Sequence, residues 1–133
     1  MRRVLLIDDD SQARNAVALA LRAKGFDVVA VESGHAGLRA FQTESFDVVI
    51  ADVFMPGMDG VKLIKALREH KPDFPVIAIS GVLLRGTGRT ALDLFPMSPE
   101  LANVFCLQKP FRPHDLLHAI SCATGTYIPA PAA

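Results

Sequence analysis

The sequence has no excess of either charge. Lysine and arginine together number 14, aspartate and glutamate also number 14, and the formal net charge is zero. A nucleic-acid-binding surface normally shows as a surplus or a run of basic residues. We therefore expect this chain to have no nucleic acid partner.

Long apolar runs are also missing. None approaches the ~20 residues that cross a bilayer, and the first run stops at Asp8, too early for a signal peptide. The only cysteines, Cys106 and Cys122, are interpreted as reduced thiols rather than a disulfide framework. Their spacing to the four histidines, which we expect on the solvated surface, matches no metal-ligand pattern. These absences predict a cytoplasmic protein with no membrane attachment.

The length and composition of the chain fit one folded domain. Half of the 133 residues are apolar, which excludes a disordered chain, and no internal repeat or low-complexity segment occurs. We expect the domain to span residues 1–126 and a short Pro/Ala-rich tail to follow over residues 127–133.

Short apolar runs alternate with segments of helical periodicity. Continuous apolar runs are typical of strands buried on both faces, and their alternation with helices predicts a doubly wound five-stranded parallel sheet with helices on both faces. The runs are residues 4–7, 28–31, 48–51, 76–79 and 104–107.

Four helices follow from the same pattern. Ser11 is the expected N-cap of the first, which Gly25 should end, and Pro113 suits the first turn of the last. The two between them are expected over residues 37–44 and about 59–70.

Residues 81–103 fit the alternation poorly. Glycines predict a mobile loop, residues 90–95 could form a helix of under two turns before Pro96, and Ser98-Pro99-Glu100 looks like the start of another. We expect a fourth crossover helix here that is short, broken or displaced.

Polar residues end four of the strands on one edge of the expected sheet: Asp8 with Asp9, Asp52, Ser80 and Lys109. Taken singly, each has an ordinary interpretation as a solvated loop, a turn residue, a helix cap or a surface charge. Together they converge where open parallel sheets bind ligands.

Crowded carboxylates repel one another unless a cation is present, and hard oxygen ligands with open positions suit Mg²⁺. A carboxylate beside Mg²⁺ can attack phosphorus as a nucleophile. The three oxygens of a transferring phosphoryl group could then meet the cation, the Lys109 ammonium and the Ser80 hydroxyl. The residues thus predict phosphoryl transfer onto one of these carboxylates.

The segment 52–60 reads Asp-x-x-Met-Pro-x-Met-Asp-Gly, preceded by Asp8-Asp9 and followed by Ser80-Gly81 and Lys109-Pro110. With these motifs, residues 3–124 resemble the receiver domain of two-component response regulators, of the chemotaxis-type single-receiver kind. The resemblance implies a flavodoxin-like strand order, 2-1-3-4-5.

The resemblance also implies a metal site. Asp52 would be the phosphoacceptor, Asp9 and Asp52 would ligate Mg²⁺ directly, Asp8 would act mainly through a bound water, and the backbone carbonyl of Phe54 would complete the protein ligands.

Two further roles follow from the resemblance. Ser80 takes the position of the switching hydroxyl, and Lys109 that of the phosphate-contacting lysine. A cis bond between Lys109 and Pro110 would aim the lysine into the site.

The function implied is a phosphorylation-dependent signalling switch rather than a conventional enzyme. It would take phosphoryl groups from a sensor histidine kinase or a histidine phosphotransfer protein and signal through the face of its fourth helix, fifth strand and fifth helix. A phosphorylation-dependent dimer is one form that its output could take. The identity of the output protein does not follow from the sequence.

Three alternatives stay open. The main one is a degenerate receiver that acts as a phosphorylation-independent binding module. The second is a phosphatase with an aspartyl nucleophile, which would need a general acid at the position of Phe54. The third is a flavin-binding protein of the same fold, in which the acidic crevice would repel the phosphate of the flavin.

The sequence departs from the family at two places. The usual switch aromatic, three residues before the lysine, is here Cys106, and strand alternation should turn Phe105 to the opposite face. The segment from Ser80 to Lys109 is also longer than usual. We expect the Cys106 thiol to serve packing rather than redox switching.

Overall fold

The structure is a computed structural model of the chain. It describes residues 2–52, 60–80, 83–84, 89–90, 104–108 and 111–125. The roles predicted for Phe54 and Lys109, the Lys109–Pro110 bond and the tail at residues 127–133 lie outside the described residues.

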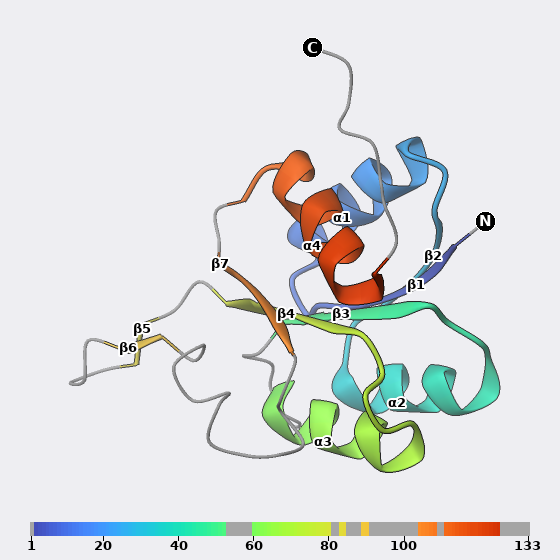
Figure 1. Ribbon diagram of the computed structural model, residues 1–133. Helices are drawn as coiled ribbons and strands as arrows, with labels where there is room; N and C mark the ends of the chain where they lie inside the picture. The colour runs from blue at the N-terminus through green and yellow to red at the C-terminus, as the bar shows by residue number, and fades with distance from the viewer. Residues whose placement is uncertain are drawn as a thin grey trace.

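A five-stranded parallel sheet forms the centre of the molecule (Figure 1). The strand order is β2-β1-β3-β4-β7, which corresponds to 2-1-3-4-5 and confirms the expected topology. The strands are β1 (Arg3–Ile7), β2 (Asp27–Val31), β3 (Val48–Asp52), β4 (Val76–Ser80) and β7 (Phe105–Gln108).

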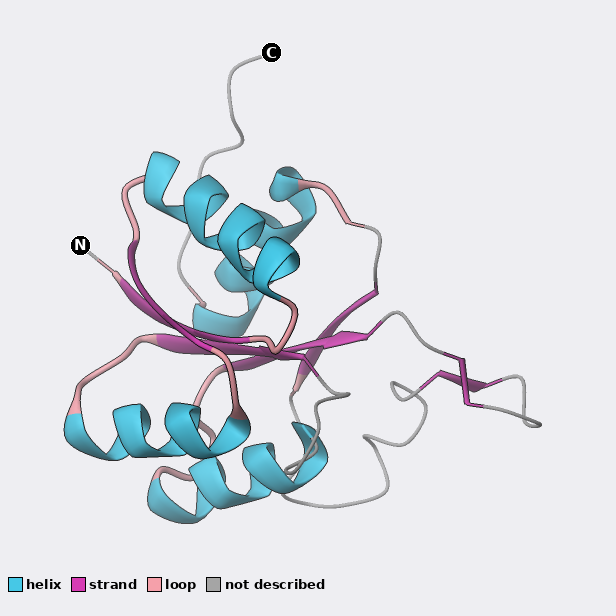
Figure 2. Ribbon diagram, turned by 180° about the vertical axis from the view of Figure 1, so that it is seen from behind, coloured by secondary structure: helices cyan, strands magenta, loops and turns pink. Residues whose placement is uncertain are grey.

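Helices cover both faces of this sheet, as predicted (Figure 2). One face carries α1 (Ser11–Ala23) and α4 (Pro113–Thr124), and the other carries α2 (Gly34–Thr43) and α3 (Gly60–His70). Within the described part of the chain, no helix combines the length and hydrophobicity needed to cross a membrane.

Strand alternation divides the apolar side chains into two cores. Leu5 of β1 packs with Leu67 of α3, whereas the next residue, Leu6, packs with Leu21 of α1 and Ile120 of α4. All five side chains are at most 1 % exposed. Because successive residues of a strand face opposite ways, a strand between two helix layers must be apolar at every position.

Helix α1 begins with a different cap from the one predicted. The N-cap is Asp10, not Ser11: its carboxylate accepts hydrogen bonds from the backbone N–H groups of Gln12 (3.0 Å) and Ala13 (3.4 Å). Both residue types can cap, but a carboxylate also carries negative charge favourable at a helix N-terminus. The prediction that Gly25 ends this helix is consistent with its φ of +90°.

Removing this cap should lower stability measurably. We expect Asp10→Ala to reduce the free energy of unfolding by about 1 kcal/mol, because two backbone donors lose their acceptor. Urea denaturation followed by circular dichroism measures the change. Asp10→Asn retains a capping oxygen and should lose much less; equal losses in the two variants would exclude capping as the cause.

Helix α2 starts at Gly34, three residues earlier than expected, because the Ser33 side chain accepts a hydrogen bond from the N–H of Ala36. Within this helix, a Cβ at Gly37 would overlap the side chain of Ile7. Glycine therefore lets α2 approach β1 closely.

The long segment after β4 contains a ribbon that the sequence pattern did not predict. The two-residue strands β5 (Leu83–Leu84) and β6 (Arg89–Thr90) pair antiparallel (Figure 2). The expected helix over residues 90–95 is therefore wrong at its start, since Thr90 pairs with Leu83 as a strand residue. The remainder of the predicted fourth helix lies outside the described residues.

Candidate functional site

Strand register brings two of the predicted site residues side by side. In the parallel pair β1 and β3, Ile7 is the partner of Ala51, so Asp8 and Asp52 each come one residue further along neighbouring strands. Because the strands are parallel, both carboxylates leave the sheet at the same edge.

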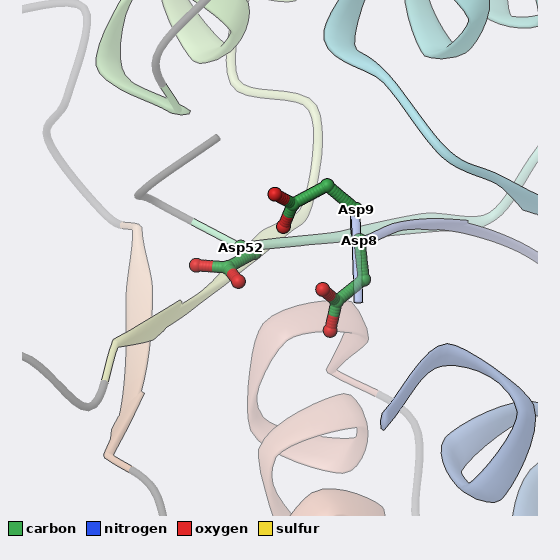
Figure 3. Close-up of side chains that lie close together, drawn as sticks. All are labelled: Asp8, Asp9 and Asp52. Carbon is green, nitrogen blue, oxygen red and sulfur yellow. The ribbon is translucent and has the colours of Figure 1, made fainter. Parts of the chain in front are cut away.

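Asp8, Asp9 and Asp52 form a compact acidic cluster at this edge (Figure 3). One carboxylate oxygen from each residue lies within 4.8 Å of the others. Asp8 and Asp9 extend from the end of β1 and Asp52 from the end of β3 (Figure 3). Among the described residues, no other set of three or more histidine, cysteine or acidic side chains has this metal-binding geometry.

Asp8 is held by its surroundings, and only 2 % of it is exposed. Its N–H donates to the carbonyl of Val31 on β2 (3.1 Å), and its carboxylate accepts from the N–H of Asp10 (3.0 Å). The Arg14 guanidinium donates to its carbonyl oxygen (2.9 Å). Contacts from β2 and α1 thus define the position of this buried carboxylate, whereas Asp9 is exposed and Asp52 is half-buried.

The cluster fits a hard divalent cation. Three carboxylates this close together repel one another unless positive charge lies between them. All three donors are oxygens, which suits Mg²⁺ or Ca²⁺ rather than a metal that prefers nitrogen or sulfur. The exposure of Asp9 leaves a side open to solvent, as Mg²⁺ requires because it keeps several waters.

Two further strands end at the same sheet edge, at or next to the predicted site residues Ser80 and Lys109 in the sequence. Ser80 is the last residue of β4, one position beyond Ile79, the partner of Asp52. It pairs with Gln108, the last residue of β7, which directly precedes Lys109. The backbone therefore ends β4 beside β3 and β7 beside β4, while the side chains of Ser80 and Lys109 lie outside the described structure.

Phe105 and Cys106 of β7 face opposite sides of the sheet, as predicted. Phe105 packs against the core beneath α1 and α4, and Cys106 against the core beneath α2 and α3. The thiol of Cys106 contacts the carbonyl of Val104 (3.8 Å), and burial raises its pKa to about 11. A half-buried thiol kept in its neutral form supports the packing interpretation.

Sequence reasoning missed Arg14. This residue lies one turn into α1, contacts the Asp8 backbone and lines a cavity of about 280 Å³ together with Val31 and Glu32. No spacing rule marks it, because an arginine in the first turns of a helix is usually a surface charge.

Comparison with known proteins assigns the chain and its fold to a family. The family model for the response regulator receiver domain matches residues 4–121. The response regulator receiver protein CpdR of Brucella abortus is 32% identical over 120 residues, which cover 90% of this chain and 94% of CpdR.

Two further similar proteins support the same family. The sensor protein GacS of Pseudomonas syringae is 37% identical over 135 residues, covering 98% of this chain but only 14% of GacS. The crystal structure of a response regulator receiver domain protein from Clostridium thermocellum superposes with a TM-score of 0.80 at 29% identity, covering 94% of this chain and 95% of that one. The family match, the strand order and the acidic cluster together show that the chain belongs to the response regulator receiver domain family of two-component systems.

Proposed function

We propose that this chain is a phosphorylation-controlled signalling switch in which Asp52 accepts a phosphoryl group from a phosphohistidine. The observation that carries the proposal is the cluster of Asp8, Asp9 and Asp52, whose carboxylate oxygens lie within 4.8 Å of one another at the carboxyl edge of the sheet. Membership of the receiver family supports the same role.

Mg²⁺ is the proposed cofactor, because the cluster offers only oxygen donors and one open side. Asp9 and Asp52 would hold it directly, Asp8 through a water, and the backbone carbonyl of Phe54 would add a ligand. When bound, the cation neutralises charge that develops on the phosphoryl oxygens.

The side chains have different proposed roles in phosphoryl transfer. A carboxylate oxygen of Asp52 attacks phosphorus; the new O–P bond forms as the P–N bond to the donor imidazole breaks, and the imidazole nitrogen leaves with the electron pair. Asp52 is half-buried at the edge, so a donor side chain can reach it, whereas buried Asp8 is held by its hydrogen bonds. Lys109 and Ser80 are proposed to bind phosphoryl oxygens.

The proposed donor is a sensor histidine kinase or a histidine phosphotransfer protein. The chain would promote its own phosphorylation and dephosphorylation without being a conventional enzyme. Its output would pass through the face that includes β7 and α4, to a partner that is not yet identified.

The main alternative is a phosphorylation-independent binding module. One observation favours it: Cys106 fills the position of the switch aromatic and packs against the core, so the usual inward swing of a ring has no counterpart at this residue. Phosphoryl uptake separates the two functions.

We expect uptake to require Mg²⁺. The purified chain is incubated with phosphoramidate, and intact-mass spectrometry follows the gain of one phosphoryl group. Chelating the metal with EDTA should slow uptake by at least about a hundredfold, because several kcal/mol of charge stabilisation are lost.

Two aspartate variants sharpen this experiment. Asp9→Asn should lose most of the Mg²⁺-dependent rate, whereas Asp10→Asn makes the same chemical change one residue outside the cluster and should retain it. Unchanged uptake in EDTA would contradict the metal's role, and no uptake by the unaltered chain under any condition would favour the binding module.

A further inference from the structure

Helix α4 presents a histidine and a cysteine in contact on its solvent side. His118 Nε2 and Cys122 Sγ are 3.5 Å apart, and both residues are exposed. They are four residues apart, so they lie on one face of the helix. The opposite face of α4, with Leu116 and Ile120, is buried in the core.

The separation of these two atoms matches that of two ligands on one zinc ion. With Zn–N of about 2.05 Å, Zn–S of about 2.3 Å and a tetrahedral angle between the bonds, the nitrogen and sulfur lie roughly 3.5–3.6 Å apart. A zinc ion can therefore bridge His118 and Cys122 without separating them. The spacing of cysteine and histidine in the sequence indicates no metal site. Sequence motifs for metal sites contain all the ligands of one ion, whereas this pair supplies only half of them.

We propose that His118 and Cys122 form half of a zinc site that a second copy of the chain completes. Structural zinc is almost always held by four protein ligands, and two such pairs give a Cys₂His₂ set. A two-fold axis through the ion relates the pairs, as in most homodimers. On binding, each Cys122 thiol releases its proton to solvent and coordinates as thiolate.

The surface around this pair permits such an approach. His114 lies one turn earlier on the same exposed stripe. The opposite charges at the start of α4, on Arg112 and Asp115, lie beside each other, with nitrogen and oxygen 3.8 Å apart. Two copies of this face therefore meet little like-charge repulsion.

The zinc site does not depend on the proposed phosphoryl chemistry. It uses α4 rather than the ends of β1 and β3, and its nitrogen and sulfur donors select zinc over Mg²⁺. Excess Mg²⁺ can therefore saturate the acidic cluster while the α4 pair is titrated.

Cobalt(II) is the probe of the ligands, since it replaces zinc and reports its surroundings by colour. The full chain, kept reduced with a phosphine in excess Mg²⁺, should develop a thiolate-to-cobalt charge-transfer band and the intense visible bands of a tetrahedral site. Absorbance should saturate at one ion per two chains. Sedimentation velocity with zinc should show a dimer, and with EDTA a monomer.

Variants assign the site. Cys122→Ser should abolish the charge-transfer band and the zinc-dependent dimer, and His118→Asn should weaken metal binding by at least about tenfold. Cys106→Ser removes the other thiol and His114→Asn removes the neighbouring imidazole; both should leave the cobalt spectrum and the dimer unchanged. His118, Cys122 and His114 are exposed and Cys106 is half-buried, so thermal melts serve to check that all four variants fold.

Three results would overturn the proposal: a charge-transfer band that survives Cys122→Ser, loss of the site in His114→Asn, or a monomer at saturating zinc. Phosphoryl uptake is measured in the same variants. If Cys122→Ser still takes up phosphoryl groups, loss of the zinc site leaves the acidic cluster functional. The zinc proposal and the proposed function are then tested separately.

Discussion

Asp52→Asn will abolish phosphoryl uptake from both phosphoramidate and a phosphorylated histidine kinase. An amide oxygen is a far weaker nucleophile than a carboxylate, and the substitution also removes one of the three charges proposed to hold Mg²⁺. Intact-mass spectrometry measures uptake from the small donor, and radiolabel transfer measures uptake from the kinase. We expect no product above background in either assay.

Asp10→Asn is the matched control. It makes the same change from carboxylate to amide in an exposed residue whose carboxylate caps α1, so uptake should remain at the level of the unaltered chain. Circular dichroism checks that both variants are folded. Labelling of Asp52→Asn at the normal level would refute Asp52 as the phosphoacceptor.

Leu67→Ala will reduce the free energy of unfolding by about 3 kcal/mol. Leu67 is fully buried where α3 packs on the sheet, so truncation removes apolar contacts and leaves a cavity. For a domain of this size the melting temperature should fall by roughly 10 °C. Urea denaturation and thermal melts measure both quantities.

Leu19→Ala is the control for this substitution. Leu19 lies on α1 and is 71% exposed, so the same change in volume should alter stability by under about 0.5 kcal/mol. Similar losses at the two positions would mean that burial of Leu67 does not account for its effect.

The sheet could be predicted because the sequences of its strands are unbroken apolar runs. Residues 4–7 and 48–51 are apolar at every position, and burial between two helix layers is what requires such runs. The acidic residue that follows each run is also visible in the sequence. For this reason Asp8 and Asp52 are expected at one edge of the sheet. The strand order, by contrast, came from resemblance to a family rather than from the pattern of apolar residues.

Local choices between similar residues were harder to predict. Asp10 and Ser11 can both cap a helix, and only the hydrogen bonds to Gln12 and Ala13 show which one does. At Thr90, antiparallel pairing with Leu83 gives a strand where the local pattern favoured a helix. In both cases the alternatives differ little in intrinsic free energy, so contacts elsewhere decide.

The sequence by itself determined the alternation of strands and helices and the chemical character of the residues near the strand ends, because the period of apolar residues and the side-chain types can be read along the chain. Only the tertiary structure decided that three carboxylates approach within 4.8 Å and that Asp8 is buried beneath contacts from Val31 and Arg14. Those features depend on strand register and on the packing of α1 against the sheet, which join residues far apart in the chain.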